Sequence, residues 1–236
     1  MCMSSEASFT LAAVLAISGG YCVHRAARLD RSLLPLAIIP LVFSAQQFCE
    51  GWVWTGVARG DPALTQVAAV SYLWFALLFW PVWVPFSMLR VERSRRARWF
   101  LRAVTAIGAV LGLGLFVPLL LDPGWLAVQV SRHSIHYSLG RSPIFQIVPG
   151  ELWQVVYLLV VAAPLFVSSA HKMVHLGVAV ILSAAVSYVF FDHALASVWC
   201  FFAAVLSIYL CVIFADRDLA HALLPDPRNA GPGRTP

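Results

Sequence analysis

The chain has 236 residues, of which 61% are hydrophobic and only 11% charged, and its mean hydropathy is +0.82. Soluble domains carry about 25% charged residues. The composition therefore excludes an ordinary water-soluble domain and predicts an integral membrane protein whose main partner is the lipid bilayer. The apolar segments do not alternate as the strands of a membrane barrel do, so we expect an all-α fold.

Seven apolar segments are candidates for membrane-spanning helices, which need roughly 20 residues each; the first is short by itself, and we expect residues 4–8 to form its outer turn. In chain order they are residues 9–22, 33–57, 64–89, 99–121, 152–169, 174–191 and 196–214. The sequence thus predicts one transmembrane domain over residues 1–216, a seven-transmembrane helix bundle. Residues 225–236 are polar and rich in Pro and Gly, and we expect residues 217–236 to form a disordered cytoplasmic tail.

The positions of the basic residues predict the orientation. They gather between spans one and two, three and four, and five and six, and in the C-terminal tail; only Arg59, Arg132 and Arg141 lie on the other side. Short basic loops stay in the cytoplasm, so we expect the N-terminus outside and the C-terminus inside. The net charge of +5 then reflects topology, and no nucleic-acid partner is expected.

The basic residues also bear on localisation. Lys172 is the one lysine among 16 basic residues. Such a preference for arginine indicates a GC-rich genome, and we expect the protein in a bacterial plasma (inner) membrane.

The second span carries three polar side chains in the stretch SAQQFCEGWVW. Gln46 and Gln47 precede Glu50 by four and three residues, so the three share one broad helix face. An ionised group inside the membrane costs about 3 kcal/mol on insertion scales, so the Glu50 side chain should face the bundle interior. One interpretation is hydrogen bonding between helices; the other is a ligand or metal site.

Further His, Cys and Asp residues are expected toward the same outer side of the membrane. They are Cys2, Cys200, His133, His136, Asp192 and His193. With Glu50 they form a candidate site for a divalent metal such as zinc or copper, or an acid–base set. Cys2 and Cys200 could be bridged, ligating or free. His171 and His175, spaced i and i+4, are weaker candidates at the cytoplasmic side.

The long segment between the fourth and fifth spans reads PGWLAVQVSRHSIHYSLGRSPIFQIVPG, residues 123–150. Its middle alternates and contains β-branched and aromatic residues, which predicts a short hairpin or an interfacial segment. Such a piece could cap the outer opening of the bundle. The alternative is a belt of aromatic residues at the level of the headgroups.

Three stretches resemble a known family. MCMSSEASF, LPLAIIPLVFSAQQFCEGWVW and SVWCFFAAVLS are similar to motifs of uncharacterised bacterial seven-helix integral membrane proteins, the domain of unknown function 6629. The family pattern opens MCFSA-x-ASF, so Met3 and Ser5 are mild departures. The resemblance implies Cys2, Gln46, Gln47, Glu50 and Cys200 as characteristic positions, and it implies no activity.

A weaker resemblance is to seven-helix metal-dependent membrane hydrolases related to ceramidases. Those enzymes carry HxxxH on the last helix, whereas His171 and His175 begin the sixth span here. The leading prediction is therefore a membrane protein with a polar, outward-facing site centred on Glu50 that binds a metal ion or small ligand. A metal-dependent hydrolase and a structural subunit of a membrane complex or homo-oligomer stay open. No catalytic residue or cofactor is assigned.

Overall fold

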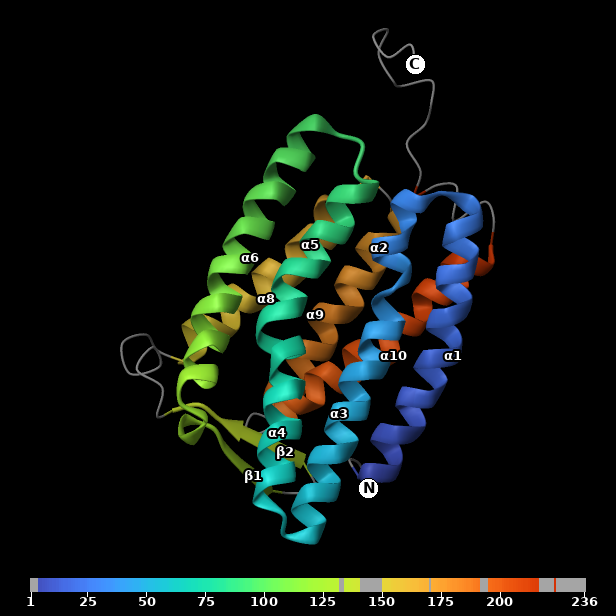
Figure 1. Ribbon diagram of the computed structural model, residues 1–236. Helices are drawn as coiled ribbons and strands as arrows, with labels where there is room; N and C mark the ends of the chain where they lie inside the picture. Colours follow the sequence, from blue (N-terminus) through green and yellow to red (C-terminus); the bar gives the residue numbers. More distant parts are fainter. Residues whose placement is uncertain are drawn as a thin grey trace, which may run out of the picture.

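The computed structural model describes residues 4–131, 134–140, 150–169, 171–191, 195–216 and 223. In this part of the chain, long helices run up and down beside one another, and one β-hairpin lies at one end of the bundle (Figure 1). We call that end, which also carries the turn at Gly60, the hairpin end.

The helices form successive rods. The first four rods are α1 (Ser5–Leu29); η1 (Arg31–Leu33), α2 (Leu34–Ala37) and α3 (Ile39–Arg59) end to end; α4 (Pro62–Leu73), η2 (Trp74–Phe79) and α5 (Trp80–Val91) end to end; and α6 (Arg95–Leu121). After the short η3 (Pro123–Trp125) and strands β1 (Ala127–Ser131) and β2 (Ser134–Ser138) come α8 (Gly150–Val167), α9 (His171–Phe191) and α10 (Leu195–Ala215).

The rods match the segments expected from hydropathy. In the described part of the chain, six helical rods are long and apolar enough to cross a membrane, and α8 is shorter. The structure therefore agrees with an all-α, multi-pass membrane protein. The seventh crossing and the orientation stay predictions.

Prolines mark two irregular points in the rods. A wide π-helical segment, η2, ends at Phe79, two residues before Pro81. The rod that contains α2 and α3 is interrupted at Ile38, two residues before Pro40. Proline has no N–H and its ring crowds the carbonyl four residues earlier, so the regular hydrogen-bond ladder cannot continue there.

Glycines bring α1 close to α3. A Cβ at Gly19 would lie 2.6 Å from the backbone nitrogen of Leu41, and one at Gly51 would lie 2.6 Å from the ring of Phe9. In this close contact the Ser44 hydroxyl donates a 2.6 Å hydrogen bond to the carbonyl of Ala12. The approach seals one side of α3 and helps to bury its polar residues.

Gly108 and Gly112 serve the same purpose in α6. A Cβ at Gly108 would lie only 1.9 Å from the carbonyl oxygen of Pro81, and one at Gly112 would lie 2.9 Å from the Cα of Leu78. This pair of glycines therefore lets α6 pack directly on the backbone of the preceding rod. The contact is internal to the chain.

The hairpin predicted between the fourth and fifth spans is present. β1 pairs antiparallel with β2, with Val130 opposite Ile135, and Ile135 is buried. The hairpin packs against α10 and α4, and Gln66 of α4 donates a 2.6 Å hydrogen bond to the carbonyl of Pro123 just before it. The segment thus covers one end of the bundle, and its position outside the membrane stays a prediction.

At the opposite end, Glu92 ties two interhelical connections together. Its carboxylate accepts hydrogen bonds from the Ser169 N–H (2.9 Å) and hydroxyl (2.5 Å), and from the N–H groups of Arg93 and Ser94 (2.8 Å each). Burial alone would raise the pKa of Glu92, but these hydrogen bonds outweigh it and hold the pKa below the ordinary value of 4.5.

Candidate functional site

The polar face of α3 points into the bundle. Gln46 and Gln47 have no exposed surface and Glu50 is 1% exposed. They share this face because helical residues three and four apart lie side by side. The expected burial of the three polar residues is thus confirmed.

Both oxygens of the Glu50 carboxyl group accept hydrogen bonds. The Gln47 amide donates to Oε2 at 3.2 Å, and the Ser197 hydroxyl, from the first turn of α10, donates to Oε1. A buried carboxyl group without such partners would be costly. The sequence interpretation of hydrogen bonding between helices therefore describes part of what Glu50 does.

Gln46 connects α3 to α5. Its Oε1 accepts a 2.6 Å hydrogen bond from the indole N–H of Trp80, and the Trp80 ring stacks on Phe43 with a centroid separation of 3.9 Å. The buried thiol of Cys200, one turn beyond Ser197 on α10, lies near the Gln46 amide and the Tyr72 hydroxyl. We call the set of Gln46, Gln47, Glu50, Ser197 and Cys200 the polar cluster.

Two tyrosines lie next to the polar cluster on the side of the hairpin. Tyr72 of α4 is buried, and its hydroxyl donates a 3.2 Å hydrogen bond to the carbonyl of Ala196 at the start of α10. The Tyr137 ring of β2 stacks on the Tyr72 ring, with centroids 5.0 Å apart and planes 15° apart. The hairpin thus lies between the polar cluster and the surface of the hairpin end.

Several polar atoms around the cluster have no hydrogen-bond partner among the described residues. They are Gln46 Nε2, Gln47 Oε1, the Tyr137 hydroxyl and, between Ser197 and Cys200 on α10, Trp199 Nε1. Buried polar groups in native proteins are almost always paired with protein, water or a ligand. These atoms are therefore available to hydrogen-bond a water molecule or a ligand.

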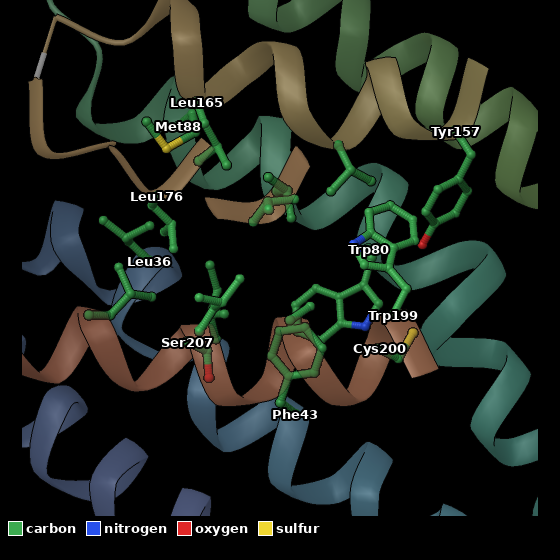
Figure 2. A pocket seen from close by; sticks show the side chains of 17 residues that line it. Leu36, Phe43, Trp80, Met88, Tyr157, Leu165, Leu176, Trp199, Cys200 and Ser207 are labelled. Carbon is green, nitrogen blue, oxygen red and sulfur yellow. The ribbon is translucent and has the colours of Figure 1, made fainter. Parts of the chain in front are cut away.

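An apolar cavity of about 70 Å³ adjoins the polar cluster. Figure 2 shows Trp80, Trp199, Tyr157 and Cys200 at one end of this cavity, and Leu36, Met88, Leu165 and Leu176 at the other. One water molecule needs about 10–15 Å³, yet cavities lined by apolar side chains stay dry and take apolar guests. The lining here is almost entirely hydrophobic.

The cavity is long rather than round. Its wall on α10 includes residues from Trp199 to Leu210, which at about 1.5 Å per residue covers about 16 Å of helix. A volume of about 70 Å³ spread over that length is narrow. The shape suits an extended hydrocarbon chain better than a compact ring system.

The structure brings together only some of the residues that the sequence singled out. Gln46, Gln47, Glu50 and Cys200 form one cluster. His136 lies on β2 next to Tyr137, and neighbouring residues of a strand point to opposite faces, so it faces away from Tyr72. His175 is exposed in the first turns of α9.

The expected metal site stays a prediction. Cys2, His133, Asp192 and His193 lie outside the described residues, as does the side chain of His171. Within the described residues, no group of three or more His, Cys, Asp or Glu could hold a metal ion. Among the described residues Cys200 has a free thiol, and its relation to Cys2 stays a prediction.

Sequence reasoning missed Ser197, Trp80, Tyr72 and the cavity. Ser197 had a usable signal, because it lies three residues before Cys200 in SVWCFFAAVLS and therefore on the same helix face. Trp80 and Tyr72 had none, since their roles depend on which helices are neighbours.

A comparison with known protein families matches residues 1–223 to a family of unknown function, DUF6629. The chain belongs to the DUF6629 family. No curated protein and no solved structure matches it. The suspected family is thereby confirmed. Two of the three stretches that carry the resemblance to DUF6629, those in α3 and α10, supply all five residues of the polar cluster.

Proposed function

We propose that this DUF6629 protein is a multi-pass membrane protein that binds a neutral, single-chain amphiphile between its helices. The polar head would lie at the polar cluster and the hydrocarbon chain in the apolar cavity. The observation that carries this proposal is that the two regions share a wall: Trp80 and Cys200 line the cavity, and the same residues contact Gln46 of the polar cluster.

The cavity supports a chain-like ligand. The helices around it are apolar enough to lie in a bilayer, whose interior consists of hydrocarbon chains. Such a chain gains little by leaving lipid for an apolar wall, so it would bind through close packing and through its head. Small-molecule pockets in proteins typically have this composition: a largely apolar lining with a few fixed polar groups.

The polar cluster supports a neutral head. The unpaired N–H groups of Trp199 and Gln46 are donors, so they favour a head with an acceptor oxygen. A carboxylate or phosphate head would lie close to the Glu50 carboxyl group, and two acidic groups in a dry site disfavour each other's charge. A hydroxyl or carbonyl head satisfies the donors without that penalty.

The proposal includes the topology expected from the arginines. In it all seven rods cross the membrane, the N-terminus lies outside, the C-terminus lies in the cytoplasm, and the hairpin covers the outer side. The polar cluster, which adjoins the hairpin through Tyr72 and Tyr137, then lies in the outer half of the bilayer.

A photolabelling experiment tests the ligand class. The purified protein, in lipid nanodiscs, is irradiated with a long-chain alcohol that carries a diazirine within its chain, and the labelled residues are mapped by mass spectrometry. We expect saturable labelling of cavity residues such as Val180 and Leu206. Excess hexadecanol should suppress it about tenfold more effectively than palmitate, a difference of about 1.4 kcal/mol.

Labelling of lipid-facing residues supplies the internal control. Val205 and Val212 on α10 are exposed and do not line the cavity, so their labelling should rise linearly with probe concentration and resist competition. Labelling confined to such residues would reject the cavity as a binding site. Equal competition by palmitate and hexadecanol would reject the neutral head.

A further inference from the structure

Two cysteines outside the polar cluster meet between the first and last described helices. The Sγ atoms of Cys22 in α1 and Cys211 in α10 are 2.7 Å apart, although 189 positions separate them in the sequence. Both are free thiols. The S–S bond of a disulfide measures about 2.05 Å, so the sulfur atoms would have to approach by less than about 1 Å to become bonded.

Neighbouring contacts fix the register of α1 against α10 at this point. One turn further along both helices, Arg25 Nε donates a 3.1 Å hydrogen bond to the carbonyl of Phe214. On the other side of the pair, the Cys211 thiol lies 3.4 Å from the carbonyl of Ser18. The two helices run in the same direction here, and these contacts hold the thiols opposite each other.

We propose that Cys22 and Cys211 form a redox-active dithiol that closes to a disulfide. The oxidant would be a small-molecule disulfide of the glutathione type. Cys22 is fully buried, whereas Cys211 is partly exposed and lies one turn from the end of α10 at Ala215. Cys211 is therefore the sulfur that a reagent in the solution at that end of the helix reaches first.

The reaction proceeds by two thiol–disulfide exchanges. The Cys211 thiol loses its proton and attacks one sulfur of the reagent, which forms a mixed disulfide and releases one thiolate. The Cys22 thiol then loses its proton and attacks Cys211 Sγ, which forms the protein disulfide and releases the second thiolate. Two protein thiols and one small disulfide thus become one protein disulfide and two small thiols, once the released thiolates take up the two protons.

The disulfide would join α1 and α10, the first and last described helices, covalently. Helix α1 packs along α3, which carries Glu50, and α10 carries Ser197, its hydrogen-bond partner. A cross-link that closes such a long loop restricts the unfolded chain strongly. We therefore expect oxidation to stabilise the fold whether or not any ligand binds in the cavity.

Thiol counting in the full chain tests the proposal. The protein in detergent is treated with oxidised glutathione, denatured, reacted with a maleimide mass tag, and digested for peptide mapping. Wild type should lose two of its five reactive thiols, and mapping should find a Cys22–Cys211 peptide pair. The melting temperature should rise by at least about 4 °C, and treatment with dithiothreitol should bring it back to the value of the untreated protein.

Matched variants separate this pair from the other cysteines. Cys22→Ser and Cys211→Ser should lose the cross-linked peptide and the rise in melting temperature, whereas Cys49→Ser, which alters a partly buried cysteine of α3, should retain both. Five reactive thiols after treatment of wild type, a mixed disulfide that stays on Cys211, or a cross-link from Cys22 to any other cysteine would overturn the proposal.

Discussion

The Ser197 hydroxyl on α10 donates a hydrogen bond to the Glu50 carboxyl group on α3, across 147 positions of sequence. This bond joins two helices that the hydropathy pattern treats as independent spans. It also places Cys200, one turn further along α10, beside Gln46. The packing of α10 on α3 therefore brings Ser197 and Cys200 to the three polar residues of α3.

Substitutions at Glu50 should separate its charge from its hydrogen bonds. Glu50→Gln keeps one acceptor, and because Gln47 Oε1 is unpaired, the Gln47 amide can turn to accept from the new side chain. We expect a loss of less than about 1 kcal/mol in the free energy of unfolding. Glu50→Leu leaves the Ser197 and Gln47 donors buried and unpaired, and it should cost about 2–4 kcal/mol.

Unfolding measured in detergent checks these values, with a double-mutant cycle for the pair. Ser197→Ala should cost about 1 kcal/mol in the wild-type protein. In the Glu50→Leu background, where its partner is already absent, the same substitution should cost much less. Ser71→Ala, which removes an exposed hydroxyl bonded to its own helix, is the control and should be nearly neutral. Additive effects of Ser197→Ala and Glu50→Leu would show that the bond contributes nothing.

Gly108 should be intolerant of any side chain. A methyl group there would meet the backbone of Pro81, which cannot move aside as a flexible side chain could. We expect Gly108→Ala to destabilise the protein by about 1–3 kcal/mol. Gly20→Ala is a matched control in another helix, because nothing lies within 4 Å of the added methyl group. It should be neutral or stabilising by up to about 1 kcal/mol, and equal effects of the two substitutions would contradict the packing described for α6.

Glu92 should give the protein an acid-sensitive connection. Its pKa is lowered in the folded state, so its contribution is complete above the ordinary carboxyl value of 4.5 and is lost as the pH falls through the lower folded value. At pH 7 we expect Glu92→Gln to cost about 1 kcal/mol. Between pH 5 and pH 3, the unfolding free energy of this variant should fall less steeply than that of wild type. Identical pH profiles would show that the hydrogen bonds from Ser169 do not depend on the charge.

The proposed topology has a direct test. A reporter fused after Pro236 should be cytoplasmic, and one inserted at Gly140, just after the hairpin, should be outside. The reason is that the basic residues gather on the side of the α5–α6 connection. A cytoplasmic signal at Gly140 would place the polar cluster in the inner half of the membrane and would contradict the proposed orientation.

Much of the fold could be predicted because its causes are local. Apolar runs predicted the rods, the alternation around Ile135 predicted the hairpin, and the spacing of Gln46, Gln47 and Glu50 predicted one buried face. Each of these depends on a short stretch of chain and on the solvent around it.

The rest depends on which helices are neighbours. Ser197 reaches Glu50, and Cys22 reaches Cys211, only because α10 packs against both α3 and α1. Hydropathy does not encode that order. The cavity is further removed still from local sequence, because six helical elements contribute to its wall.

The central claim is that an amphiphile lies in the apolar cavity with its head at the polar cluster. The most direct measurement compares ligand retained by two variants of α10. Ala203→Trp fills the cavity, since Ala203 lines it, whereas Val205→Trp adds the same side chain at a position that is 41% exposed and outside the cavity. Both proteins are purified with tritiated hexadecanol, after each has been shown to unfold cooperatively in detergent.

We predict about one bound alcohol per chain for wild type and Val205→Trp, and a loss of at least about tenfold in affinity for Ala203→Trp. Equal binding by the two variants, or no saturable binding to wild type, would contradict the account.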